Sequence, residues 1–135
     1  MKQKGCSILF VNNRNEILLF LRDNKPDIPF PNMWDILGGH VENDETSEEC
    51  IVREMKEEMN LDLQGFQLFS VVDFPDRTEY TFWKKKNLDI AQINLIEGQC
   101  LKWFTQEEVE NTEVAYGFNK IIEDFFRMAP FASHN

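Results

Sequence analysis

Three glutamates, Glu54, Glu57 and Glu58, lie close together near the middle of the chain. If this segment is helical, a rotation of about 100° per residue brings the three carboxylates onto one narrow face. Like charges at these spacings oppose helix formation by roughly 0.2–0.5 kcal/mol per pair, so a positive charge should compensate them. A divalent cation would do so, because hard cations bind carboxylate and carbonyl oxygens and leave room for phosphate oxygens and water.

The residues around these glutamates follow a regular spacing that begins at Gly38-Gly39. A flexible Gly-Gly pair lets a backbone carbonyl approach a cation closely. Five residues separate Gly39 from Glu45, and seven separate Glu45 from Arg53. An acidic helix alone is usually just a solvated face, so it is the complete spacing that favours a functional site.

This spacing, carried on to Asn60 and Leu61, resembles the Nudix box. Asn60 stands where the box usually has Gly, and Asn also tolerates the left-handed conformation. Leu37 stands where a Pro usually precedes the Gly-Gly. Further matches are closest to the MutT-type nucleoside triphosphate pyrophosphohydrolases, and they comprise Glu16-Ile17 with Arg22, Asp35-Ile36 before the box, Phe74-Pro75-Asp76-Arg77, and Glu97-Gly98-Gln99 followed by Trp103.

The resemblance implies a catalytic role for the box and a divalent metal, Mg²⁺ or Mn²⁺. The ligands it implies are the Gly38 carbonyl and the carboxylates of Glu54, Glu57, Glu58 and Glu97. Glu45 and Arg53 would orient these ligands. Metal-activated water would attack a phosphorus of a diphosphate linkage, with Glu54 or Glu97 as the general base. MutT-like enzymes attack the β-phosphorus and release nucleoside monophosphate and pyrophosphate.

Substrate contacts are also implied by the resemblance. Arg22 is a candidate phosphate clamp, because its guanidinium can bind phosphate in a bidentate way. The positions for base recognition are Ile36, Asp76, Arg77 and Asn119, with Phe118 as the competing occupant of the last position. The favoured substrates are nucleoside triphosphates, including 8-oxo-dGTP. ADP-ribose, nucleotide sugars and dinucleoside polyphosphates remain open, because specificity lies in loops.

One alternative comes from a different class of protein, a non-catalytic Nudix-fold module that binds a nucleotide and regulates a partner. Such a module would have no chemical reason to keep a repulsive carboxylate cluster. The sequence therefore favours an enzyme over this alternative.

Local patterns predict the elements that position these residues. Apolar stretches at 6–11 and 16–21 predict a hairpin, and prolines make 23–32 a surface loop. Thr46 with Glu49 forms a capping box, which predicts a helix that ends near Asn60. Further strands are expected at 66–74, 78–85 and 100–104, with a loop at 87–98. A second capping box, Thr105 with Glu108, precedes a closing helix at 118–128.

Interleaved strands and helices predict a mixed β-sheet between helices, in the α+β class, and the resemblance implies the α/β/α sandwich of the Nudix fold. The chain has 135 residues, of which 42% are hydrophobic, so we expect one domain over 1–135, with a flexible tail at about 129–135.

The net charge of −10 argues against a nucleic-acid polymer as partner, so the expected partner is a small nucleotide. Apolar runs are too short to span a membrane, and the first residues do not resemble a signal peptide. A cytoplasmic location follows as the expectation. Cys6, Cys50 and Cys100 are odd in number and widely spaced, which predicts reduced thiols. The oligomeric state stays open.

Overall fold

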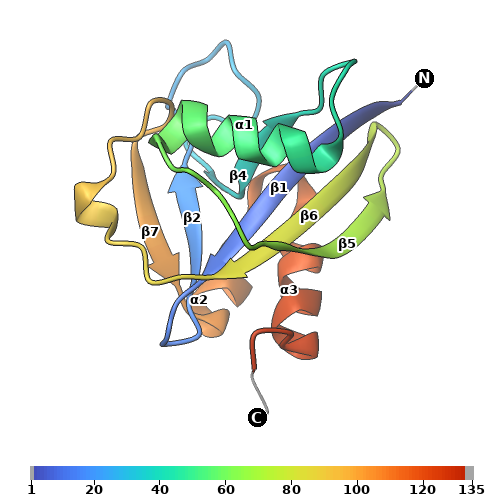
Figure 1. Ribbon diagram of the computed structural model, residues 1–135. Coiled ribbons are helices and arrows are strands. Elements are labelled where there is room, and N and C mark those ends of the chain that lie inside the picture. Colours follow the sequence, from blue (N-terminus) through green and yellow to red (C-terminus); the bar gives the residue numbers. More distant parts are fainter. Residues whose placement is uncertain (1, 133–135) are drawn as a thin grey trace.

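A seven-stranded sheet runs through residues 2–132, the part of the chain that the computed structural model describes (Figure 1). The strands are β1 (Gln3–Val11), β2 (Ile17–Leu21), β3 (Trp34–Asp35), β4 (Leu37–His40), β5 (Gln67–Asp73), β6 (Arg77–Lys85) and β7 (Cys100–Phe104). The helices are α1 (Ser47–Met59), α2 (Gln106–Glu110) and α3 (Asn119–Met128), with short 3-10 turns η1 (Ile90–Gln92) and η2 (Ala115–Gly117). None of the helices in residues 2–132 combines the length and the apolar character needed to cross a membrane.

The sheet is mixed, with β1 at its centre. The strand order is β3-β2-β1-β6-β5, while β4 pairs with β1 and β7 pairs with β2. β1 runs parallel to β6 and antiparallel to β2 and β4. The expected hairpin of β1 with β2 is confirmed, and the strands expected at 66–74 and 78–85 form the antiparallel pair β5 and β6.

Helices cover both faces of the sheet because successive side chains of β1 point to opposite sides. Leu9 packs in one core cluster with Phe125 of α3. Ile8 packs in the other core cluster with Met55 of α1. Figure 1 shows α1 across one face and α3 behind the other. The predicted α+β fold, an α/β/α sandwich around a mixed sheet, is confirmed.

Helix α1 begins and ends at the predicted residues because both ends are capped locally. The Glu49 backbone N–H donates to the Thr46 hydroxyl at 3.1 Å, and the Thr46 N–H donates to the Glu49 carboxylate at 2.8 Å. Asn60 has the left-handed φ of 53°, and its N–H donates to the Lys56 carbonyl. The second capping box, Thr105 with Glu108, starts α2 in the same way.

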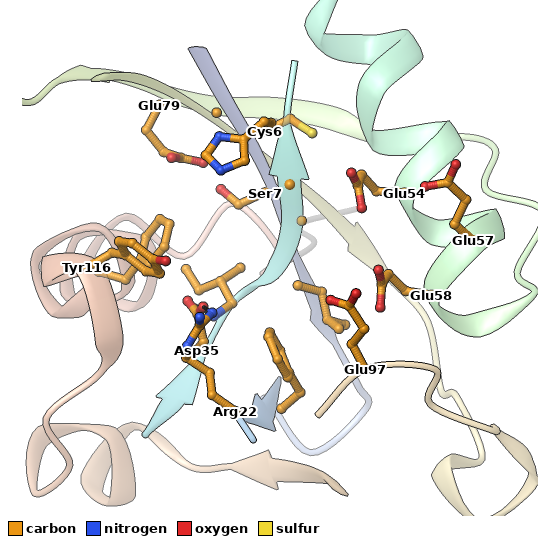
Figure 2. Close-up of a pocket in the computed structure, with 18 of the residues that line it drawn as sticks. Cys6, Ser7, Arg22, Asp35, Glu54, Glu57, Glu58, Glu79, Glu97 and Tyr116 are labelled. Carbon is orange, nitrogen blue, oxygen red and sulfur yellow. Dashed lines mark hydrogen bonds and ion pairs between the residues drawn. The ribbon is translucent and has the colours of Figure 1, made fainter. Parts of the chain in front are cut away.

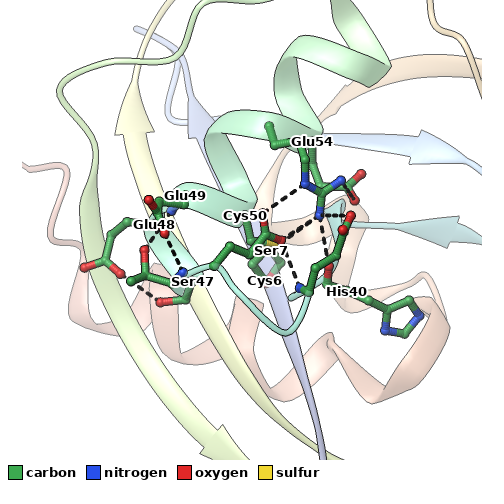
Figure 3. Close-up of a disulfide and its surroundings, with 12 residues drawn as sticks. Cys6, Ser7, His40, Ser47, Glu48, Glu49, Cys50 and Glu54 are labelled. Carbon is green, nitrogen blue, oxygen red and sulfur yellow. Dashed lines mark hydrogen bonds and ion pairs between the residues drawn. A yellow bond between two sulfur atoms is a disulfide. The ribbon is translucent and has the colours of Figure 1, made fainter.

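Cys6 of β1 and Cys50 of α1 form a disulfide, with their Cα atoms 6.5 Å apart (Figure 3). The prediction of three reduced thiols is therefore wrong for this pair. The two residues are 44 positions apart in the chain, and only the packing of α1 onto β1 brings them together. Cys100 is an exposed free thiol, as predicted. The cytoplasmic location stays a prediction.

The chain after α3 folds back onto the core. Phe131 is 7% exposed, and its ring centroid lies 5.1 Å from that of Phe125. Residues 129–132 belong to the flexible tail expected at about 129–135, and Phe131 within them packs on the core, while the flexibility of the tail stays a prediction. The rest of the expected tail, 133–135, lies outside the described residues.

Candidate active site

A cavity of about 600 Å³ opens beside β4. Figure 2 shows two groups of its side chains on the two sides of this strand. We call one the acidic end, which is lined by Glu54, Glu57, Glu58 and Glu97. We call the other the polar chamber, which is lined by Ser7, Asp35, Arg77, Glu79, Tyr116 and Phe118. One cavity therefore joins the predicted catalytic glutamates to a second set of polar and aromatic residues.

Helix α1 and one loop build the acidic end. Ile51 and Met55 are buried in the core, so the neighbouring helical face presents the three glutamates to the cavity. The backbone N–H of Ile96 donates to the carbonyl of Glu58 at 3.0 Å. This hydrogen bond holds the loop against α1, so Glu97 reaches the same end of the cavity.

The acidic end carries repulsive negative charge. Burial raises the pKa of Glu58 to about 7, and the charges of Glu97, Glu54 and Glu57 add to the rise. Burial also raises the pKa of Glu54, while the Arg53 charge opposes that rise. A cation bound here would favour the ionised carboxylates and would lower both pKa values.

Arg53 connects these glutamates to the loop before α1. Its Nε and Nη2 donate to the two carboxylate oxygens of Glu45 at 3.0 and 2.7 Å. Its Nη1 donates to Glu57 at 3.0 Å and to Glu54 at 3.2 Å. Hydrogen bonds from Arg53 lower the pKa of Glu45 to about 2. These contacts suit the orienting role predicted for Glu45 and Arg53. Arg53 contacts two of the four glutamates at the acidic end.

The Gly38-Gly39 pair lets neighbouring groups lie very close to its backbone. A Cβ atom on Gly39 would overlap the Glu54 carboxylate, and one on Gly38 would overlap the Cys6 carbonyl oxygen. Leu37, at the position where a Pro was expected, is 2% exposed and packs in the core cluster that contains α1. The loop is therefore held by strand pairing and packing, without the proline.

The donors at the acidic end fit a hard divalent cation. Within residues 2–132, no three His, Cys, Asp or Glu side chains converge closely enough to form a ready-made metal site. The four glutamates nevertheless line one end of one cavity together with Gly38. Carboxylates and a backbone carbonyl are the oxygen donors that Mg²⁺ and Mn²⁺ prefer.

Three of the predicted substrate residues, Arg22, Ile36 and Arg77, line the cavity. Arg22 is already engaged, because its Nη1 donates to Asp35 at 3.0 Å and its Nε to the Pro29 carbonyl at 2.9 Å. Asp76 does not line the cavity, and its side chain is 67% exposed beside Arg77.

Asn119 does not line the cavity either. Its amide oxygen accepts from the Val114 N–H at 2.8 Å, and its Nδ2 donates to the Thr112 carbonyl at 2.7 Å. Both ends of the amide thus hydrogen-bond the turn before α3. The neighbouring Phe118, the competing occupant, lines the cavity instead.

Besides Arg77 and Phe118, the polar chamber contains residues to which the sequence analysis assigns no role. Burial raises the pKa of Asp35 to about 6, against the lowering effect of Arg22. Burial also raises the pKa of Glu79, against hydrogen bonds from Arg77 and Ser7. The alternation of Arg77, Glu79 and a threonine along β6 could have indicated a polar face. No local pattern indicates that Tyr116 joins them.

The fold is an α/β/α sandwich, and the glutamates of α1 line its cavity. Together these two features define the class of protein. The NUDIX domain family model matches residues 1–125. The chain belongs to the Nudix family and is a Nudix hydrolase. The resemblance found at residues 38–61 is thereby confirmed.

Curated relatives of this chain include proteins with named activities. The ADP-ribose pyrophosphatase of Methanocaldococcus jannaschii is 33% identical over 120 residues, which cover 87% of this chain and 69% of that protein. The 8-oxo-dGTP diphosphatase of Escherichia coli is 33% identical over 85 residues, which cover 62% of this chain and 64% of that protein. The chain thus matches just under two thirds of the second relative.

Solved structures share the fold. MutT, from a study of Aliivibrio salmonicida and Vibrio cholerae, superposes with a TM-score of 0.76 at 22% identity, over 95% of this chain and 99% of that one. The NUDIX domain of Shewanella oneidensis NrtR, complexed with ADP ribose, superposes with a TM-score of 0.74 at 16% identity, over 96% and 88%. At these identities, the superpositions establish the fold alone.

Proposed function

We propose that this Nudix hydrolase is a divalent-metal-dependent diphosphohydrolase that cleaves nucleoside triphosphates to nucleoside monophosphate and pyrophosphate. The observation that carries the proposal is the single cavity that joins the acidic end to the polar chamber. A nucleoside triphosphate needs both environments, a cation-binding end for its phosphates and a partly aromatic recess for its base.

Glu54, Glu57, Glu58, Glu97 and the Gly38 carbonyl would hold Mg²⁺ or Mn²⁺ at the acidic end. The metal, when bound, would lower the pKa of water and offset the charge of the phosphates. Arg53 keeps Glu54 and Glu57 in place through its hydrogen bonds. Glu54 or Glu97 would accept the proton of the attacking water, and the Glu54 carboxylate lies close to the backbone of Gly39.

A second candidate substrate is ADP-ribose. The similarity to the Methanocaldococcus jannaschii ADP-ribose pyrophosphatase covers 87% of this chain, against 62% for the Escherichia coli 8-oxo-dGTP diphosphatase. ADP-ribose also contains a diphosphate linkage, so the same acidic end could serve its hydrolysis. The choice between the two substrates depends on what the polar chamber accepts.

Product analysis would test the proposal. The protein is incubated with Mg²⁺ and each of 8-oxo-dGTP, the normal nucleoside triphosphates, ADP-ribose and a nucleotide sugar, and the products are separated by chromatography. Matched samples with EDTA show whether the reaction needs a divalent metal. We expect fastest turnover of a triphosphate, with monophosphate and pyrophosphate as products. If only ADP-ribose is hydrolysed, the proposed substrate is wrong and ADP-ribose, the second candidate, takes its place.

Oxygen-18 water identifies the phosphorus that is attacked. Attack on the β-phosphorus places the label in pyrophosphate and leaves the monophosphate unlabelled. Label in the monophosphate would contradict the proposed route, although it would leave the diphosphohydrolase activity itself intact.

A further inference from the structure

Glu79 is a buried carboxylate in the polar chamber that the proposed hydrolysis does not use. It is 3% exposed, yet it lines the cavity. In the strand register, Glu79 of β6 lies beside Gly5 of β1, and Gly5 lies beside His40 of β4. Residues in register on neighbouring strands share one face of the sheet. A Cβ atom on Gly5 would overlap the Glu79 carboxylate, so the absence of a side chain at Gly5 makes room for that carboxylate in the polar chamber.

Arg77 holds Glu79 in this position. The Arg77 Nε donates to the Glu79 carboxylate at 2.7 Å. The rest of the guanidinium is occupied, since Nη2 donates to the Tyr116 carbonyl at 3.3 Å and Nη1 contacts Asp76. The guanidinium also lies 4.3 Å from the ring centre of Phe74. Arg77 therefore positions Glu79, and its hydrogen bond favours the ionised carboxylate, which acts only as a hydrogen-bond acceptor.

A purely structural role explains this pair poorly. A buried ion pair contributes little net stability, because the cost of removing both charges from water offsets their attraction. The pair also lies in a cavity wall beside Tyr116 and Phe118, where a flat ring could stack. An acceptor beside a stacking surface is the combination that reads the edge of a nucleobase.

We propose that Glu79 selects the nucleobase, by accepting hydrogen bonds from two adjacent N–H groups of a guanine-type base. This inference rests on the proposed function, and it names the substrate class within it. A guanine-type edge presents N1–H next to the N2 amino group, which matches the two oxygens of one carboxylate, because the oxygen that accepts from Arg77 has a second lone pair. Adenine presents one donor next to one acceptor, so its ring nitrogen would face a carboxylate oxygen without a hydrogen between them.

The Glu79→Gln variant tests this selection directly. A glutamine offers one donor and one acceptor, which is the complement of adenine. We expect the wild-type protein to have a higher kcat/KM for dGTP than for dATP, and the variant to lower this ratio by roughly 10- to 100-fold, the usual range for a bidentate base contact. The matched control is Glu110→Gln, an exposed glutamate of α2 outside the cavity, which should keep the wild-type ratio. An unchanged ratio in Glu79→Gln would overturn the proposal.

A second variant guards against loss of folding, because Glu79→Gln leaves Arg77 without its buried partner. Glu79→Asp keeps the charge but withdraws the carboxylate by one methylene group. It should weaken the use of dGTP without improving the use of dATP. A higher kcat/KM for dATP in Glu79→Asp would contradict the proposal, because aspartate lacks the amide donor that should favour adenine in Glu79→Gln.

Binding separates this inference from the proposed function. Calorimetry with GMP and AMP, in EDTA, measures base selection without any hydrolysis. Tighter binding of GMP, abolished in Glu79→Gln, would support the inference even if no triphosphate were hydrolysed, and the proposed function alone would then fail. Equal binding of GMP and AMP by the wild-type protein, or binding of neither, would overturn the inference even if triphosphates were hydrolysed.

Discussion

Reduction of the disulfide between Cys6 and Cys50 should lower the free energy of unfolding by about 4 kcal/mol. The two residues are 44 positions apart, and the loop-entropy relation gives about this value at 25 °C for a closed loop of that size. The reduced protein should stay folded without denaturant, because Ile51 and Met55 still bury their side chains between α1 and the sheet.

Urea unfolding, followed by tryptophan fluorescence with and without a phosphine reductant, measures this difference. All measurements use a Cys100→Ser background, so that the exposed free thiol cannot contribute. We expect a lower midpoint in the reduced sample, read as a lower extrapolated free energy of unfolding. Coincident unfolding curves would refute the reasoning. So would two thiols titrating in the denatured, unreduced Cys100→Ser protein, because the pair would then not be bonded.

Two further predictions concern other buried groups. The folded pKa of Asp35, about 6, lies above its ordinary value of 3.8, so Asp35 favours folding below pH 4 and loses that contribution as the pH rises towards 6. Relative to Asp35→Asn, the wild-type free energy of unfolding should fall by about 2–3 kcal/mol between pH 4 and pH 7 in urea titrations, and parallel pH profiles would contradict this. Phe131→Ala should lower the free energy of unfolding by about 3 kcal/mol in the same assay, because it empties a buried aromatic site; an unchanged midpoint would mean that Phe131 does not pack on Phe125.

The parts of the fold that local chemistry controls could be predicted from the sequence. Thr46 and Glu49 cap one another within a single turn, and Asn60 ends the same helix, so the position of α1 needs no distant contact. The spacing of the glutamates along α1 then determines which face they share. Prediction of the three helix glutamates at the acidic end therefore required only the helix and its periodicity, whereas Glu97 comes from a separate loop and was implied by the family resemblance.

The polar chamber could not be predicted in this way, because its residues meet only through long-range pairing. Glu79 lies in the polar chamber because the parallel pairing of β6 with β1 aligns it with Gly5. The Cys6–Cys50 pair likewise depends on how α1 packs over β1. Asn119 shows the opposite case. Its side chain has the right chemistry for base recognition, but two backbone groups nearby hydrogen-bond it, and its role stays a prediction.

The central claim is that the glutamates of α1 form the site at which a diphosphate linkage is hydrolysed. One matched comparison of two variants tests this claim most directly. Glu57→Gln removes a carboxylate at the acidic end, and Glu48→Gln removes an exposed one from the same helix outside the cavity. Both should remain folded, since Glu57 is 57% exposed and its ion pair with Arg53 is worth only about 0.3–0.5 kcal/mol.

Turnover of the preferred nucleotide with Mg²⁺ is measured for both variants and for the wild-type protein. We predict that Glu57→Gln lowers kcat by orders of magnitude, while Glu48→Gln retains wild-type turnover. Equal turnover in the wild-type protein and Glu57→Gln would contradict the assignment of the acidic end as the hydrolytic site.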